Sequence, residues 1–239
     1  MQAGALYSKD FYRERSDAAR LAARIVLRHW TMLFGGFQRV VDVGCGDGAW
    51  LAECSRLGAT QILGVDGAWV PQDILQIPSA SFRCRDLERP LDLARTFDLA
   101  ISLEVLEHLP PHAARPFIGE LVKLAPMVLF SAAIPGQGGT GHQNEQWQSH
   151  WASIFASYGY QAIDAIRPAI WTDEDVPVWY RQNILVYARP PLPNFATSLA
   201  SPMLDVVHPE LFEFVRNPPM PEPSVKGGLR GLAFAGESS

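Results

Sequence analysis

The stretch VVDVGCGDGAW, residues 40–50, decides the fold of this chain of 239 residues. Three valines around Asp42 predict a short buried strand, and Gly44, Gly46 and Gly48 follow it at alternate positions. Glycine there lets the chain turn tightly and lets a ligand approach the backbone without a Cβ in the way. The helical pattern AWLAECSRL comes next, so the sequence predicts a strand, a glycine-rich turn and a helix.

The spacing of these glycines gives information about the ligand. It follows a G-x-G-x-G register, whereas dinucleotide-binding turns follow G-x-G-x-x-G and use the third glycine for helix packing. The shorter register favours an adenosyl amino acid, which has no pyrophosphate. A plain strand-to-helix connection is the alternative interpretation of such a turn when it stands alone. The motifs that follow along the chain decide against this alternative.

Two more predicted strands end in carboxylates. The stretch ILGVDG ends in Asp66 and Gly67, and a carboxylate at this place can accept both hydrogen bonds of a ribose diol. The stretch FRCRDL ends in Asp86 and Leu87, where a side-chain oxygen can accept a hydrogen bond from an adenine amino group. For Asp86 alone, a solvated loop aspartate is an equally good interpretation.

Strands and helices alternate along the chain. Short β-rich runs occur at residues 40–43, 62–65, 97–102 and 127–130. The segments between them predict helices or loops, and this alternation is typical of a parallel sheet with helices on both faces. Two late runs, residues 160–166 and 184–188, are strand-like and can pair as an antiparallel edge. The residues between these two runs show no helical pattern.

The ends of the chain differ in composition from its middle. Ser16 offers N-cap chemistry to a helix that ends at Gly35. We therefore expect three parts: an N-terminal helical segment (1–38), a ligand-binding domain (39–189) and a proline-rich C-terminal tail (190–239). Most of the tail is expected to be extended or disordered. Residues 204–215 keep apolar character, and we expect them to pack on the surface or on a partner.

The ordered series VDVGCGDG, GVDG, RDLE and FDLAISLEVLEHL resembles the motif set of class I S-adenosylmethionine (SAM)-dependent methyltransferases. The resemblance covers about residues 39–109. It implies an α/β, Rossmann-like fold with a seven-stranded, mostly parallel sheet, one antiparallel strand and helices on both faces. It also implies SAM as the cofactor and methyl transfer as the reaction, in which the protein mainly orients donor and acceptor. The implied SAM-binding residues are Asp42, Gly44, Cys45, Gly46, Gly48, Asp66, Gly67, Asp86, Leu87 and Leu103.

A cluster of carboxylates and imidazoles follows the fourth predicted strand. Glu104, Glu107 and His108 stand at i, i+3 and i+4, which on a short helix places the three side chains on one face. His142, in a glycine-rich stretch after the fifth strand, is a candidate fourth member. Such a set suits manganese, cobalt or zinc well and magnesium only partly. The E-x-x-E-H element resembles that of plant small-RNA 2′-O-methyltransferases and of ubiquinone-pathway O-methyltransferases.

Two interpretations of this cluster remain open. With a metal, Glu104, Glu107, His108 and His142 are the ligands, and the ion lowers the pKa of an acceptor hydroxyl. Without a metal, His108 or His142 is the general base and Glu104 faces the cofactor. Both favour O-methylation of a small molecule of sugar or natural-product type. The alternatives are an RNA-end 2′-O-methyltransferase and a SAM-binding partner protein without catalysis.

Composition limits the acceptor and the compartment. The net charge is −5 and no block of Lys or Arg stands out, so nucleic acid is an unfavoured partner. The three cysteines form no C-x-x-C pair, which fits a reducing cytoplasm, and the polar start of the chain is unlike a secretory signal. The longest apolar run is too short to span a bilayer. We expect a cytoplasmic enzyme without a membrane partner, and the sequence leaves its oligomeric state open.

Aromatic residues are candidates for an apolar acceptor pocket. They are Trp147, Trp151, Trp171, Trp179 and Tyr180. Core packing is the alternative for each of them. The Asn/Asp-Pro-Pro-aromatic element of base-modifying methyltransferases does not follow the fourth strand, where the sequence has Leu103 and Glu104. Base modification is therefore disfavoured.

Overall fold

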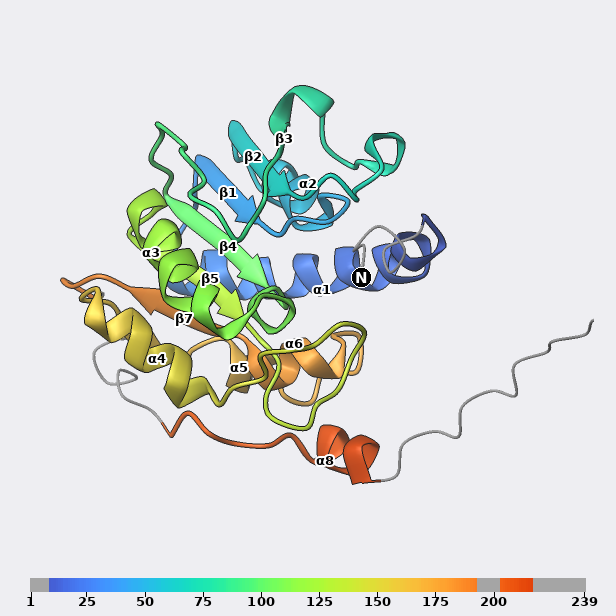
Figure 1. Ribbon diagram of the computed structural model, residues 1–239, viewed down its shortest axis with the longest axis vertical. Helices are drawn as coiled ribbons and strands as arrows, with labels where there is room; N and C mark the ends of the chain where they lie inside the picture. Colours follow the sequence, from blue (N-terminus) through green and yellow to red (C-terminus); the bar gives the residue numbers. More distant parts are fainter. Residues whose placement is uncertain (1–8, 193–202, 217–239) are drawn as a thin grey trace, which may run out of the picture.

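The computed structural model describes residues 9–192 and 203–216, which build one seven-stranded sheet with helices on both faces (Figure 1). The strands are β1 (Arg39–Val43), β2 (Gln61–Asp66), β3 (Phe82–Cys84), β4 (Leu99–Leu103), β5 (Met127–Ser131), β6 (Gln161–Ile163) and β7 (Leu185–Ala188). They pair in the order β3-β2-β1-β4-β5-β7-β6. Strand β7 runs antiparallel to β5 and β6, and the other pairs are parallel. The predicted Rossmann-like sheet with one antiparallel strand is confirmed.

Strands β1 and β4 lie at the centre of the sheet. Val40 pairs with Ile62 of β2 on one side and with Leu99 of β4 on the other. All five residues of β4 are buried, as are the last four of β1. Because helices cover both faces, these strands are continuous apolar runs rather than alternating ones. Because they are buried on both faces, these strands could be predicted from their apolar residues alone.

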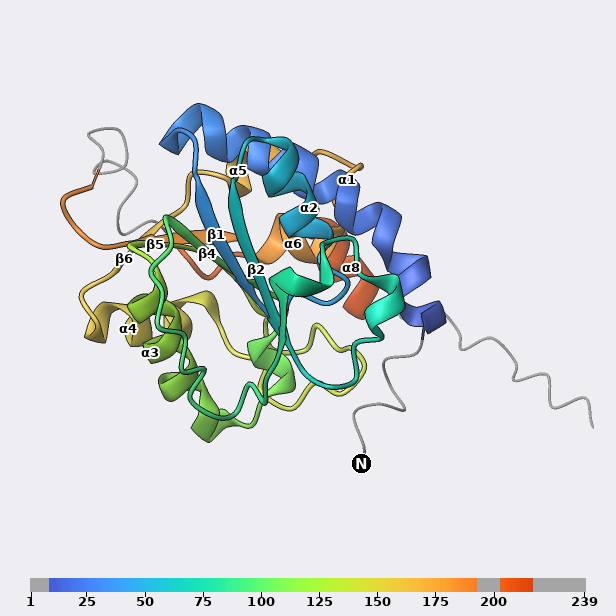
Figure 2. The ribbon, with the colours of Figure 1, turned by 90° about the horizontal axis from the view of Figure 1, so that it is seen from above.

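Helices form one layer on each face of the sheet (Figure 2). Helices α1 (Lys9–Phe34), α2 (Ala49–Arg56) and α5 (Arg167–Ile170) cover one face, and α3 (Ala114–Leu124) and α4 (Gln148–Ser157) cover the other. Helices α6 (Val178–Asn183) and α8 (Pro209–Arg216) complete the set. Short 3-10 turns are η2 (Gln72–Ile74), η3 (Ser79–Ser81), η4 (Leu106–His108) and η5 (Pro111–Ala113). No described helix has the length and apolar character needed to cross a bilayer.

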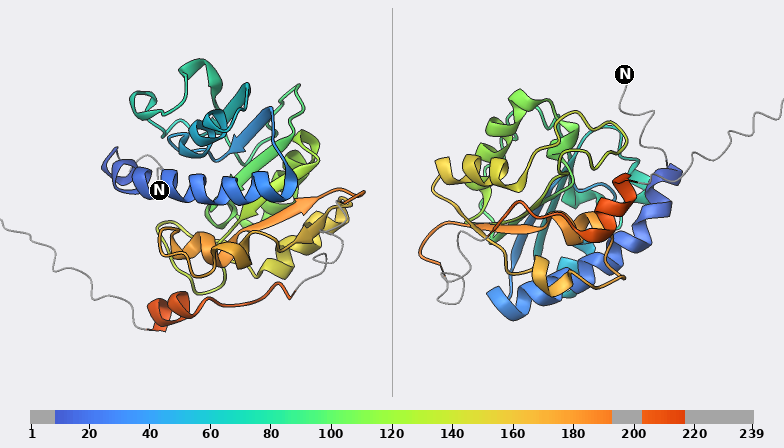
Figure 3. Two further views of the ribbon diagram at one scale, coloured as in Figure 1. Left: turned by 180° about the vertical axis from the view of Figure 1, so that it is seen from behind. Right: turned by 90° about the horizontal axis from the view of Figure 1, so that it is seen from below.

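Helix α1 is longer than the sequence predicts. It begins at Lys9 rather than at Ser16, so Ser16 is not an N-cap. Instead, the Ser16 hydroxyl donates a 2.8 Å hydrogen bond to Asp47 Oδ2 in the glycine-rich turn. The helix lies along one face of the sheet (Figure 3, left) and buries Ala22, Ala23, Val26, Leu27 and Trp30 there. The helical segment is thus continuous with the core of the domain.

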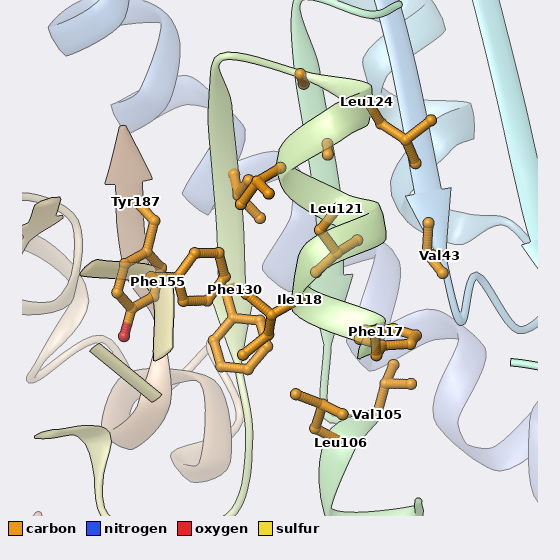
Figure 4. Close-up of a cluster of buried hydrophobic side chains, with 14 of the residues drawn as sticks. Val43, Val105, Leu106, Phe117, Ile118, Leu121, Leu124, Phe130, Phe155 and Tyr187 are labelled. Carbon is orange, nitrogen blue, oxygen red and sulfur yellow. The ribbon is translucent and has the colours of Figure 1, made fainter. Parts of the chain in front are cut away.

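The opposite face has its own apolar cluster, centred on α3 (Figure 4). Phe117, Ile118, Leu121 and Leu124 stand at helical spacing and face the sheet, since positions three and four apart share one side of a helix. Beside them the rings of Phe155 and Tyr187 stack with centroids 3.8 Å apart. The two clusters hold the sheet rigidly between two layers.

The connection from β6 to β7 corrects a prediction. The expected antiparallel pairing of the two strands is confirmed, but the segment between them contains the short helices α5 and α6. Pro168 lies in the first turn of α5, and Pro177 directly precedes α6. Proline is tolerated at these positions because the first N–H groups of a helix have no partner within it. The prolines start these helices rather than preventing them.

Residues 203–216 return to the domain and pack on it, as expected for residues 204–215. The buried Arg167 side chain pairs with Asp164 and donates hydrogen bonds to the carbonyls of Met203 and Leu204. Leu204 packs against the apolar cluster beneath it. The remainder of the predicted tail, residues 193–202 and 217–239, and residues 1–8 lie outside the described residues. The domain boundary near residue 189 stays a prediction.

We predict that Arg167→Ala lowers the free energy of unfolding by about 3 to 5 kcal/mol, because it leaves the Asp164 carboxylate without its cation. Arg39→Ala is the matched control. It removes a second Arg–Asp pair, Arg39–Asp98, whose side chains are 45% and 35% exposed, against 2% and 12% in the first pair. The control should cost about 1 kcal/mol or less. Urea unfolding measures both, and equal losses would contradict the structural role of Arg167.

Candidate functional site

A cavity of about 720 Å³ lies where the parallel strands end. Both groups of predicted site residues contribute to its wall. Gly44, Gly46, Asp66, Leu87 and Leu103 line one part. Glu104, Glu107, His108 and His142 line the other part. Open α/β sheets bind ligands at this edge, outside the carboxyl ends of the strands.

The glycine-rich turn carries a steric requirement. Gly44 has φ +87°, and a Cβ there would lie 2.3 Å from Val105 Cγ2. Its N–H donates to Val65 O at 2.8 Å, so the turn is tied to the end of β2. No side chain fits at this position, which explains the first glycine of the motif.

Asp66, at the end of β2, organises the loop around it. Its carboxylate accepts hydrogen bonds from Gly46 N at 2.7 Å and Gly67 N at 2.6 Å. Burial raises the pKa of Asp66 to about 6, although these bonds and one from the Trp69 side chain oppose the rise. The carboxylate is therefore held in place at the cavity wall, and its role as a ribose ligand stays a prediction. Trp69 also lines the cavity, which no sequence motif indicated.

Asp42 and Cys45 lie beside a smaller cavity of about 140 Å³. Gly44, Gly46 and Leu103 line both cavities, so the two adjoin at the glycine-rich turn. Burial raises the pKa of Asp42 well above its usual range, and the charge of Asp66 adds to this effect. A cationic ligand group nearby would favour the ionised form of Asp42.

Asp47 fixes the turn to its surroundings. Its carboxylate accepts hydrogen bonds from Ala49 N at 3.1 Å, from Ser16 Oγ at 2.8 Å and from Gln76 Nε2 at 2.8 Å. The side chain thereby joins the start of α2 to α1 and to the segment after β2. Asp47 was not among the predicted site residues, because its partners are distant in sequence.

The backbone that carries Glu104, Glu107 and His108 differs from the predicted short helix. Glu104 has φ +54°, and only residues 106–108 form a 3-10 turn, so no helical face carries all three side chains. Potential ligand atoms of Glu107, His108 and His142 nevertheless lie within 4.8 Å of one another. The glycine-rich loop after β5 brings His142 to this position, with its ring centroid 4.8 Å from that of His108.

Glu107 is the most unusual member of this group. Its side chain is fully buried, and neither carboxylate oxygen has a described donor in good hydrogen-bond geometry, although the N–H groups of Glu107 and Ala133 and the Glu104 carboxyl lie nearby. Burial and the charge of Glu104 raise the pKa of Glu107 well above its usual range. A buried carboxylate without well-placed donors is costly unless a cation compensates it.

The two histidines have different environments. Burial, helped by the charge of His142, lowers the pKa of His108 to about 4, so its ring is neutral near pH 7. His142 Nδ1 lies 2.8 Å from Glu145 Oε1, and Glu145 also accepts hydrogen bonds from Gly136 N and Gly138 N. Glu145 thus orients the His142 ring and holds the loop that carries it. No sequence motif indicated that Glu145 would orient His142.

Glu104 lies next to the group but has its own partners. Its carboxylate accepts hydrogen bonds from Gln137 Nε2 at 3.2 Å and Asn183 Nδ2 at 3.1 Å. The backbone N–H of Glu104 donates to Ser131 O, which holds the residue in its left-handed conformation. Non-glycine residues in this region carry strain that cores rarely retain without a functional reason. Burial raises the pKa of Glu104.

Comparison with known proteins finds a family match in the first half of the chain. Residues 12–125 match a family described as a methyltransferase domain. This stretch of the chain is similar to methyltransferase domains. A stretch of 103 residues is 35% identical to a ubiquinone biosynthesis O-methyltransferase of Neisseria meningitidis, covering 39% of this chain and 43% of that protein. The chain spans less than half the length of the curated relatives that it matches.

Solved structures agree on the fold. SAM-bound magnesium protoporphyrin IX methyltransferase from Synechocystis is 20% identical, with a TM-score of 0.55, and the match covers 77% of this chain and 93% of that one. SAM-bound CalS10, an amino pentose methyltransferase from Micromonospora echinaspora, is 15% identical, with a TM-score of 0.55 and coverage of 76% and 95%. At these identities the likeness concerns the fold alone.

Three of the predicted SAM-binding residues do not line either cavity. Gly48 has φ +84° and precedes α2, and Gly67 supports Asp66 through its N–H. The side chain of Asp86 is 56% exposed and pairs with Arg89. Its role at an adenine stays a prediction, while its neighbour Leu87 does line the cavity.

The five aromatic candidates divide between cavity and core. Trp179 and Tyr180 line the larger cavity, and Trp151 is buried in the apolar cluster around α3. Trp171 packs against His208, and Trp147 is 39% exposed. None of the described residues that line the cavity is Lys or Arg. The wall therefore offers no fixed positive charge to a ligand.

We predict that Asp66→Ala weakens SAM binding by about 1.5 to 3 kcal/mol, because charge-assisted hydrogen bonds to the ribose are lost. Isothermal calorimetry measures the affinity, and circular dichroism checks the fold. Asp175→Ala is the matched control, since it removes an exposed carboxylate that lines neither cavity. Unchanged affinity in a folded Asp66→Ala protein would remove the ribose assignment.

The pKa of Asp66 predicts a pH dependence of SAM binding. The ionised carboxylate is the form that accepts two ribose hydrogen bonds, and its pKa of about 6 in the free protein means that the neutral form accumulates below pH 6. Affinity should be constant above about pH 7 and then fall towards tenfold per pH unit below the pKa. Calorimetry between pH 5 and 8 checks this. Asp66→Asn should bind SAM weakly at every pH, without the fall in affinity below about pH 6. If its affinity changed with pH as that of the wild type does, Asp66 would not be the titrating ribose ligand.

Proposed function

We propose that this chain is a SAM-dependent methyltransferase that methylates a hydroxyl group of a small uncharged molecule, with a divalent metal ion at the acceptor site. The observation that carries the proposal is the single cavity that Asp66 and the glycine-rich turn share with Glu107, His108 and His142. Cofactor and acceptor would meet in this space. The relatives named O-methyltransferases support oxygen as the acceptor atom.

The residues present fit a metal ion. Glu107 supplies a buried carboxylate without a described donor in good hydrogen-bond geometry, and His108 supplies an imidazole that stays neutral near pH 7. Glu145 at Nδ1 of His142 leaves the other ring nitrogen for the ion, an arrangement common in metal sites. One carboxylate and two imidazoles suit zinc, manganese or cobalt better than magnesium.

Methyl transfer needs an acceptor oxygen in line with the methyl–sulfur bond. The C–O bond forms as the C–S bond breaks, its electron pair stays on sulfur, and the hydroxyl proton must pass to a base. When bound, the metal would lower the pKa of that hydroxyl. Glu104 lines the same cavity, and its raised pKa makes it a better proton acceptor than an exposed glutamate. Asp66 and the glycine-rich turn would hold the donor.

An RNA-end acceptor fits less well. Such a substrate brings phosphates, which proteins hold mainly with Lys and Arg. The described lining of the cavity contains neither residue, and the net charge of the chain is −5. A small uncharged acceptor therefore agrees better with the electrostatics of the site.

We predict that the purified protein binds one zinc or manganese ion, measured by calorimetry and elemental analysis. Glu107→Gln should abolish this binding, and Glu145→Gln should weaken it by roughly 10- to 100-fold because His142 loses its orienting partner. Glu53→Gln is the matched control, since Glu53 is a buried glutamate that pairs with Arg56 and does not line the cavity. Wild-type metal affinity in Glu107→Gln would exclude the site.

The same proteins test the reaction. Transfer of a labelled methyl group from SAM is followed across sugars, phenolic diols and RNA ends. A chelator should stop the transfer, and added metal should restore it. Transfer that persists with the chelator, yet falls by roughly 10²-fold in His142→Ala, would replace the metal by a histidine base. A protein that binds SAM but methylates none of these acceptors would count against the proposal.

A further inference from the structure

Helix α8 contributes to the cavity although it follows the last strand and belongs to the predicted tail. Leu211, Phe214 and Val215 line the cavity together with Asp66 and His142. They stand at i, i+3 and i+4, so one face of α8 carries all three. The helix lies beside α6 at the open side of the sheet (Figure 3, right).

The position of α8 is fixed by polar contacts rather than by apolar packing alone. Arg181, buried in α6, forms an ion pair with Glu210. Gln182 donates to Val206 O at 2.7 Å and accepts a hydrogen bond from His208 N, directly before the helix. The His208 ring contacts Trp171 O at 2.7 Å. These contacts hold α8 as a built wall of the cavity.

The wall is apolar and still partly open to solvent. Phe214 is 51% exposed and Val215 43% exposed, while Leu211 is buried. Val178 and Trp179 of the neighbouring helix α6 also line the cavity. A ligand with an apolar body would cover these exposed groups, which gains free energy by removing apolar surface from water. No described lining residue is Lys or Arg, so the wall offers an anionic group no fixed positive charge.

We propose that α8 is the acceptor-selecting wall of this site and that it binds an uncharged acceptor through an apolar ring or chain next to the hydroxyl group. Phe214 and Val215 are then specificity-determining residues. This inference rests on the proposed function, because it places the acceptor beside Glu107 and His142. It goes beyond the proposed function because it assigns the choice of acceptor to α8, a helix that follows the last strand.

The test uses the full chain, loaded with S-adenosylhomocysteine, and a series of catechols with 4-alkyl chains of increasing length. Calorimetry should show that affinity rises by roughly two- to fourfold per methylene group in the wild type. Phe214→Ala should lose most of this rise, and Phe214→Trp should bind the longest chain more weakly because it fills the space. An anionic analogue, 3,4-dihydroxybenzoate, should bind more weakly than catechol.

Phe212→Ala is the matched control. Phe212 is on the same helix and is also 51% exposed, but it does not line the cavity, so this variant should keep the wild-type series. Phe212→Ala should also bind SAM with wild-type affinity. A wild type that shows no gain with chain length, or equal losses in Phe212→Ala and Phe214→Ala, would overturn the role of α8. Loss of SAM binding in the wild type would instead overturn the proposed function.

Discussion

Parallel pairing of β1 with β2 and β4 is the constraint on which the site depends. Strands that run in the same direction end at the same edge, and the register opposite Asp42, with Gly64 on one side and Ile101 on the other, sets how far each strand extends. The turn after β1, Asp66 and Glu104 therefore meet at one place although they are far apart in sequence. Buried helices on both faces keep this edge rigid, so the cavity wall is largely formed before a ligand arrives.

The edge gathers negative charge in a buried environment. Asp42, Asp66, Glu104 and Glu107 all have raised pKa values, and burial is the largest cause for each of them. Such a concentration of carboxylates opposes folding, because desolvated anions lie close together. A sulfonium cofactor or a metal ion would compensate that charge. In the proposed function, the site exchanges stability of the free protein for affinity towards cations, a trade-off typical of functional sites.

The sequence predicted what local patterns encode. Asp66 follows a buried apolar strand and the glycines follow β1, so both could be placed from short motifs. The convergence of Glu107 with His142 depends on a loop, and the helical argument for Glu104 was wrong because the chain turns into a left-handed conformation there. Glu145 and α8 could not be assigned, since their contacts join segments far apart in sequence. The apolar residues in 204–215 predicted that this segment would pack on another surface, but they did not indicate which one.

Helix α8 makes no strand pairing, and its described attachments are side-chain contacts to α6 and to the residues around Trp171. Residue exchanges along its inner face can therefore change the size and shape of the cavity while the hydrogen-bond register of the sheet stays intact. The two halves of the site are free to diverge at different rates. The half formed by the strand ends keeps its geometry through backbone pairing. The half formed by α8 can change one side chain at a time, which is how folds come to accept new substrates.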